Sequence, residues 1–207
     1  GVRREDYEEL PSKNIDTGAG LERIASVMQQ TESNFETDLF LPILEAITKL
    51  SHKKYDENKE AFRVIADHLR TSVFALSDGA SFANEGRGYV LRRLLRRAVR
   101  YGKKLGIDGA FLYKLVPTVV SIMVDFYPYL KTKETHVTNQ IKAEELRFLY
   151  TLSHGEELLR NALREKKALA GEIVFKLYDT FGFPLEITEE IAAEVGGKID
   201  KERFFEL

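Results

Sequence analysis

Apolar residues recur at intervals of three and four along most of the chain, which is the spacing of one buried face of an α-helix. Glycine, proline and polar clusters interrupt this pattern and mark the turns. The pattern predicts a mainly α-helical protein, a helical bundle with a short strand near its N-terminus. The expected helices cover about residues 21–30, 39–50, 59–77 and 188–195, together with a basic helix that ends near residue 104.

The pattern is less regular in three stretches. Pro117 separates two apolar segments, about 109–116 and 118–126, and we expect it to break the helix there. Residues 133–167 fit either one long helix or a pair of helices, and residues 12–16 fit a short strand. The positions expected to be buried in the long helical stretch are Ile141, Leu146, Leu149, Leu152, Leu158, Leu159 and Leu163.

The composition is that of a soluble globular protein, since 43% of the 207 residues are hydrophobic and 31% are charged. The absence of cysteine excludes disulfides, a thiolate nucleophile and cysteine-bound metal. The four histidines are far apart in the sequence, so we expect no metal site. We find no signal peptide and no apolar run of the roughly 18 residues that a membrane span needs. These features predict a cytoplasmic protein with no membrane partner.

Positive charge is concentrated in one segment. Residues 87–104 contain eight lysines and arginines and no acid, although the net charge of the chain is -2. On a helix, four of these residues form one stripe, and leucines fall on the opposite side. The stripe consists of Arg93, Arg97, Arg100 and Lys104. No glutamate stands four residues away to balance it, which favours a surface for phosphate over an ordinary solvated helix face.

Residues 16–23 read Asp-Thr-Gly-Ala-Gly-Leu-Glu-Arg, which predicts a glycine turn between a strand and a helix. Glycines let a ligand approach the backbone, and a helix N-terminus favours an anion. Asp16 at the strand end can pair with an ammonium group, and Arg23 can reach a phosphate. The alternative is that Asp16 or Thr17 only caps the helix.

Two further loops carry polar side chains suited to a nucleic acid. Asn84 precedes the basic helix, and its amide can both donate to and accept from a base edge. Asp179, in the sequence Tyr-Asp-Thr-Phe-Gly-Phe-Pro, can accept a hydrogen bond from an exocyclic amino group. The alternatives are an ordinary loop at a helix start for Asn84 and an Asx turn for Asp179.

Taken together, these blocks resemble the alanyl-tRNA synthetases, which are class II enzymes. Residues 15–24 resemble motif 3, and the other matching blocks are residues 74–79, 84–93 and 177–184. The resemblance covers essentially the whole chain, in the family's order. It implies that residues 1–30 are a remnant of the catalytic α/β domain. Residues 31–207 would then form the helical domain that recognises the tRNA acceptor stem.

The family attaches alanine to tRNA(Ala) through alanyl-adenylate, using ATP with Mg2+. The resemblance implies that Asp16 and Gly18 bind alanine and that Arg23 binds ATP, with no dedicated catalytic residue. It implies that Asn84 and Asp179 read the G·U pair of the acceptor stem. It also implies that arginines in and before the basic helix hold the RNA backbone, namely Arg87, Arg92, Arg93, Arg96, Arg97 and Arg100.

The sequence departs from the family's pattern at Ala19, where the family usually has methionine, and at Phe181, where it often has tyrosine. Motifs 1 and 2 and the zinc-binding editing domain are expected to lie outside these 207 residues. We therefore expect the fragment alone to be inactive, to need no cofactor and to bind the acceptor stem weakly. The alternative function is a non-enzymatic helical module that binds RNA or another anion.

Overall fold

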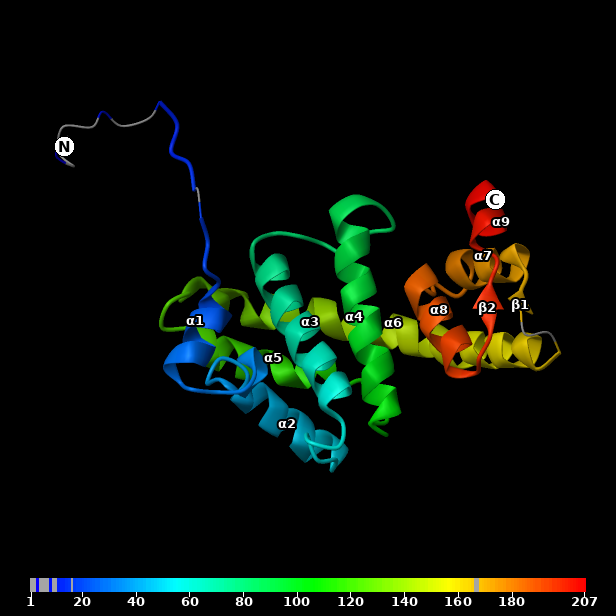
Figure 1. The fold of residues 1–207 in the computed structure, drawn as a ribbon, viewed down its shortest axis with the longest axis horizontal. Helices are drawn as coiled ribbons and strands as arrows, with labels where there is room; N and C mark the ends of the chain where they lie inside the picture. Colours follow the sequence, from blue (N-terminus) through cyan, green and yellow to red (C-terminus); the bar gives the residue numbers. More distant parts are fainter. Residues whose placement is uncertain (1–2, 4–7, 9–10, 16, 166–167) are drawn as a thin grey trace. The chain divides into compact units, whose positions relative to one another are not determined.

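The computed structural model describes residues 3, 8, 11–15, 17–165 and 168–207 of the chain. This part is built almost entirely from helices, so the prediction of a mainly α-helical protein is confirmed (Figure 1). Its elements, in chain order, are α1 (Leu21–Met28), the 3-10 helix η2 (Asn34–Glu36), α2 (Leu41–Ser51), α3 (Lys59–Ser77), α4 (Gly86–Lys104), α5 (Leu112–Met123), α6 (Tyr129–Glu165), β1 (Ala168–Leu169), α7 (Gly171–Asp179), α8 (Leu185–Glu194), β2 (Lys198–Ile199) and α9 (Lys201–Glu206).

The chain divides into two compact units, Gly1–Leu41 and Pro42–Leu207. The smaller unit contains α1 and η2, and the larger one contains the remaining helices and both strands. The domain boundary expected after residue 30 stays a prediction.

In the smaller unit, α1 begins directly after Gly20, whose positive φ of 79° is a conformation that favours glycine. A strand was predicted over residues 12–16, but residues 12–15 are not in one. A strand needs a neighbouring backbone for its hydrogen bonds, and no described segment pairs with these residues. Asp16, which ends the predicted strand, lies outside the described residues.

The core of the larger unit forms where α3 packs against α4 and where both helices contact α6. The face predicted for α3 is buried, with Phe62, Ile65 and Leu69 fully enclosed. On α4 the leucines opposite the basic stripe are buried in the same way, as at Leu91 and Leu95. Burial of these apolar faces supplies the main driving force for the assembly of this unit.

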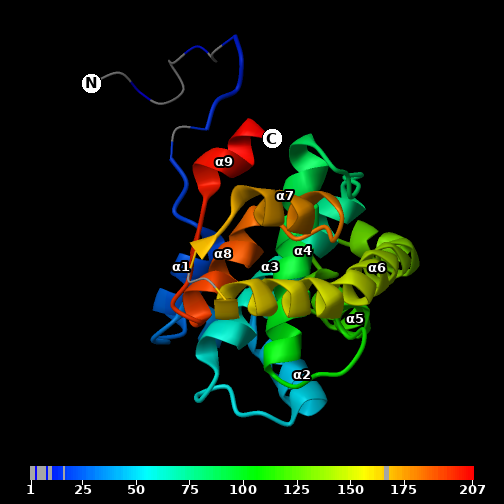
Figure 2. The same ribbon diagram turned by 90° about the vertical axis from the view of Figure 1, so that its right-hand side faces the viewer.

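Of the two possibilities left open for the stretch after residue 133, the structure has the single helix α6. It contacts α5 and α3 as well as α7 and α8, so it extends along the whole larger unit (Figures 1 and 2). The prediction that Leu146 is buried is wrong, because this side chain is 50% exposed. Glu144, Glu145 and Phe148 occupy the buried face instead, which places Leu146 on the far side of the helix.

Pro117 does not break the helix as predicted, since α5 continues through it. The apolar stripe around it is buried on both sides, at Val116 and Val119 among others. Burial of this stripe outweighs the one backbone hydrogen bond that a proline removes. The sequence pattern also missed β1 and β2, which pair in parallel with Leu169 opposite Ile199. Strands of two residues are too short to show a period of two.

The N-terminus of α5 is capped by a carboxylate from α6. Glu145 is fully buried, and its Oε1 accepts hydrogen bonds from the backbone N–H groups of Phe111 (2.6 Å) and Leu112 (3.1 Å). Burial raises the pKa of this carboxyl, against the lowering effect of those N–H groups. The folded state therefore favours the protonated form, so stability is lost as pH rises from the unfolded pKa of about 4.3 through the raised value.

Because ionisation of Glu145 destabilises the folded state, the stability of Glu145→Gln relative to wild type should depend on pH. Glutamine keeps an acceptor oxygen for the two N–H groups and never ionises. The free energy of unfolding of the variant, relative to wild type, should rise as pH increases from about 4 to about 7. Urea unfolding across this range measures the difference, and Glu157→Gln, at an exposed site on the same helix, is the control. A difference that does not change with pH would contradict the prediction.

Candidate nucleic-acid interface

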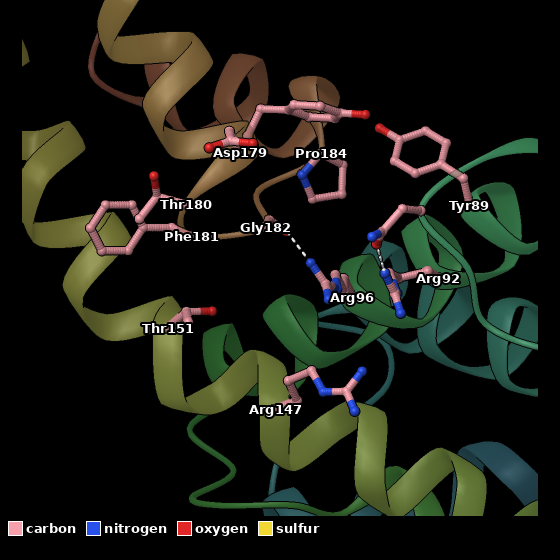
Figure 3. A pocket seen from close by; sticks show the side chains of 12 residues that line it. Tyr89, Arg92, Arg96, Arg147, Thr151, Asp179, Thr180, Phe181, Gly182 and Pro184 are labelled. Atoms are coloured by element: carbon pink, nitrogen blue, oxygen red, sulfur yellow. Dashed lines mark hydrogen bonds between the residues drawn. The ribbon is translucent and has the colours of Figure 1, made fainter.

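A pocket of about 430 Å³ opens on the larger unit between α4, α6 and the loop that follows α7 (Figure 3). Its lining combines polar side chains from all three segments with the glycine and proline of the loop. The lining residues are Asn84, Tyr89, Arg92, Arg96, Arg147, Thr151, Tyr178, Asp179, Thr180, Phe181, Gly182 and Pro184. The several hydrogen-bonding groups of this lining suit a polar ligand.

The two residues predicted to read a base pair, Asn84 and Asp179, both line this pocket although they are far apart in the sequence. Asn84 lies in the loop just before α4, and Asp179 is the last residue of α7. Both residues are exposed, so their side chains are accessible from solution. One amide and one carboxylate can donate to and accept from the edge of a single base pair.

The turn after Asp179 is anchored in the core. Phe183 is fully buried and packs edge-on against Phe148 of α6, with 5.8 Å between ring centroids. Gly182 has a φ of 65°, and its carbonyl oxygen accepts a hydrogen bond from the Arg96 guanidinium. The positive φ favours glycine here, and a side chain at this position would also force the Arg96 guanidinium to shift.

The arginines of α4 face acids from another helix. Helix α8 lies beside α4 in both views and forms a ladder of ion pairs with the basic stripe (Figures 1 and 2). The pairs are Arg93–Glu186, Arg97–Glu190 (2.7 Å), Arg100–Glu190 (3.2 Å), Arg100–Glu194 (2.7 Å) and Lys104–Glu194 (2.5 Å). The premise that no acid balances the stripe is true along α4 but wrong in three dimensions.

Exposure divides these arginines into two groups. The side chains of Arg96 and Arg100 are only 9% and 2% exposed, so they serve the fold in this structure. Those of Arg93 and Arg97 are 35% and 33% exposed. Arg87, in the first turn of α4, is exposed and has no ion pair with any residue that the structure describes. That these arginines hold the RNA backbone stays a prediction. By their exposure, Arg87, Arg93 and Arg97 are the best placed of them to contact phosphates.

Two tyrosines and two residues of α6 are among the lining residues that were not predicted as site residues from the sequence. Tyr89 and Tyr178 meet edge-to-face with 6.1 Å between ring centroids. Burial raises the pKa of Tyr89 to about 12. A tyrosine hydroxyl is protonated at neutral pH even at its ordinary pKa of about 10, so it can donate a hydrogen bond here. Arg147 and Thr151 come from α6, across the pocket from Asp179 (Figure 3). No local pattern marks these positions, because only the packing of α6 brings them to the site.

The residues predicted to bind alanine and ATP belong to the smaller unit. Gly18 is exposed, and nothing lies within 4 Å of the position that a Cβ would take there. Arg23 is exposed in the first turn of α1, and Asp16 lies outside the described residues. Their binding roles stay predictions. Across the described ranges, no three or more His, Asp or Glu side chains could hold a metal ion, so we assign no Mg2+ ligands there.

A known protein family matches almost the whole of this chain. The sequence model of the family described as "tRNA synthetases class II (A)" matches residues 2–207. The chain belongs to this family. The family resemblance drawn from the sequence motifs is therefore confirmed. Among the helices that the structure describes, none has an apolar run of the length that a membrane span needs.

Individual members of the class II (A) synthetases agree with this assignment. The chain is 56% identical to an alanine–tRNA ligase of Streptococcus thermophilus over 98% of its length. It is 54% identical to the corresponding enzyme of Streptococcus pyogenes and 53% identical to that of Streptococcus mutans, again over 98% of its length. The chain spans about a quarter of the length of these relatives, with 24% of each covered.

Proposed function

We propose that the chain is part of an alanine–tRNA ligase and that its pocket recognises the acceptor stem of tRNA(Ala). The whole cytoplasmic enzyme joins alanine to the tRNA through alanyl-adenylate, consuming ATP with Mg2+. The meeting of Asn84 and Asp179 at one pocket is the observation that carries the proposal. The identity to alanine–tRNA ligases over 98% of the chain supports it.

The chemistry of the pocket suits a G·U pair. Double-stranded RNA presents its wide, shallow minor groove to proteins, and a guanine there displays its 2-amino group. The Asp179 carboxylate accepts a hydrogen bond from that amino group, and the Asn84 amide contacts the opposite side of the pair. Arg87, Arg93 and Arg97 contact the flanking phosphates. Several such contacts make the affinity fall steeply with salt.

The smaller unit contributes to the other substrates. Asp16 and Gly18 bind alanine, and Arg23 binds ATP, in a catalytic site completed by parts of the enzyme outside these 207 residues. The step there depends on positioning and charge stabilisation, without a dedicated base from this chain. The 207 residues by themselves are accordingly inactive in aminoacylation.

Binding of RNA minihelices with G·U or G·C as the third base pair tests the base-reading role. The chain should prefer G·U by about 1–3 kcal/mol. Asp179→Ala or Asn84→Ala should abolish this preference, because each removes one of the two reading groups. Asp125→Ala, which removes an exposed acid outside the pocket, is the control. Equal binding of both RNAs by wild type would leave only a non-enzymatic module with a general affinity for anions.

A further inference from the structure

Each half of the base-reading pair is held by its own arginine. Arg92 donates a hydrogen bond to Oδ1 of Asn84, and Arg96 donates one to the carbonyl oxygen of Gly182, in the turn that follows Asp179. Both bonds are drawn in Figure 3, where the two guanidinium groups lie next to each other on α4. Each half is therefore held in part by one guanidinium, beside the anchoring of the Asp179 turn by Phe183.

A single carboxylate contacts both arginines, through hydrogen bonds to Arg96 and through an ion pair with Arg92. Oε1 of Glu144 on α6 accepts hydrogen bonds from Nε (2.9 Å) and Nη2 (2.6 Å) of Arg96. The same oxygen lies 3.1 Å from Nε of Arg92. The Glu144 side chain is 3% exposed, and the guanidinium of Arg96 also lies 5.1 Å from the Phe148 ring centroid. Burial and several charge-assisted bonds give this cluster little freedom to rearrange.

The bond from Arg92 also sets the polarity of Asn84. An arginine only donates, so it must meet the amide oxygen and not the amide nitrogen. One of the two lone pairs of the Asn84 oxygen is thereby used, and its NH2 group points away from the guanidinium and can donate to a ligand. Asn84 then acts as a donor while Asp179 acts as an acceptor. Such a pair distinguishes base pairs that differ in one amino or carbonyl group.

We propose that Glu144 is a positioning residue for the pocket. It acts through Arg92 and Arg96 and fixes both the spacing of Asn84 and Asp179 and the donor polarity of Asn84. This inference rests on the proposed function, because it explains how the pocket distinguishes one base pair from another. It assigns Arg92, whose side chain is only 13% exposed, to the orientation of Asn84 and not to an RNA phosphate.

The variant Glu144→Gln tests the shared role. It should reduce the preference for G·U over G·C about tenfold, with little change in the affinity for the G·C minihelix or in its salt dependence. Glu156→Gln is the matched control, since Glu156 is also on α6 and also pairs with a cation of α4, Lys103 (2.8 Å). The control should leave the preference unchanged. An equal loss for both RNAs in Glu144→Gln, or an equal effect of the control, would overturn the proposal.

A double-mutant cycle tests the branch through Arg92, even if Glu144→Gln does not fold. Arg92→Met should lower the preference for G·U in the wild-type background and have no further effect in the Asn84→Ala background. A direct phosphate contact would behave differently. It would weaken both RNAs in both backgrounds and reduce the slope of log affinity against log salt by about one, which would overturn the proposal.

Nuclear magnetic resonance of the Asn84 side-chain amide, without RNA, separates the two proposals. Glu144→Gln should shift this resonance, and Glu156→Gln should leave it unchanged. If the wild-type chain binds G·U and G·C minihelices equally, the proposed function fails. In that case the effect of Glu144→Gln on the Asn84 amide resonance is the test of whether Glu144 positions Asn84. An Asn84 resonance that is the same in Glu144→Gln as in wild type would overturn this positioning role.

Discussion

Gly155→Val is expected to lower the free energy of unfolding by about 3 kcal/mol, because it overfills a packed site in the core. An ideal Cβ at Gly155 would lie 2.6 Å from Cζ of Phe183, and Phe183 is fully buried. Because the Phe183 ring is fully buried, it cannot turn out into solvent to make room. The added side chain must therefore displace the turn that holds Asp179, so the preference for G·U should fall as well.

Urea unfolding measures this loss, and the two minihelices measure the change in preference. His154→Val is the matched control, since it introduces the same β-branched side chain at the adjacent, exposed position of α6. The control allows for the cost of valine in a helix, which is below about 1 kcal/mol. If Gly155→Val were as stable as the control, Phe183 would not pack against this glycine in solution.

Arg100→Met is expected to cost about 2 kcal/mol of stability, below the range for a fully buried ion pair, because only the cation is buried. Arg100 is 2% exposed and bonds Glu190 and Glu194, so its removal leaves two acids short of a buried cation. Both acids retain another partner, Arg97 for Glu190 and Lys104 for Glu194. These remaining pairs keep the cost from being higher. Methionine preserves most of the buried stem, so the effect reports mainly the charge.

The variant Arg97→Met is the comparison, because Arg97 and Arg100 pair with the same acid. Arg97 also pairs with Glu190, but its side chain is 33% exposed, so the expected cost is about 0–1 kcal/mol. Unfolding in urea at neutral pH, with both variants in parallel, measures the difference. Equal losses would show that burial does not distinguish the two arginines and that the ladder between α4 and α8 acts as one exposed network.

Local patterns predicted those parts of the protein in which one segment carries its own information. The apolar period alone located α3, and it predicted the buried side of α4, because each helix must bury one face. The motif blocks identified the family and nominated Asn84 and Asp179 by resemblance. Short stretches of sequence were enough for these inferences, because the residues that carry each of them lie close together along the chain.

The tertiary structure decided which charges meet. The acids that face the basic stripe come from α8, the acid that faces Arg96 comes from α6, and no rule based on neighbours along a helix can find them. The same is true of Glu144, which lies on α6 and holds arginines of α4. Packing also decided that α5 passes through Pro117, since burial there outweighed a local preference.

The sequence by itself determined that the chain is helical, which family it belongs to and that residues 87–104 are strongly cationic. Only the tertiary structure decided that most of this cationic charge is balanced within the protein and that Asn84 and Asp179 share one pocket. The physical reason is the separation along the chain of the residues that interact. Helix formation and motif chemistry depend on residues a few positions apart, whereas charge pairing and pocket formation depend on helices that the fold brings together.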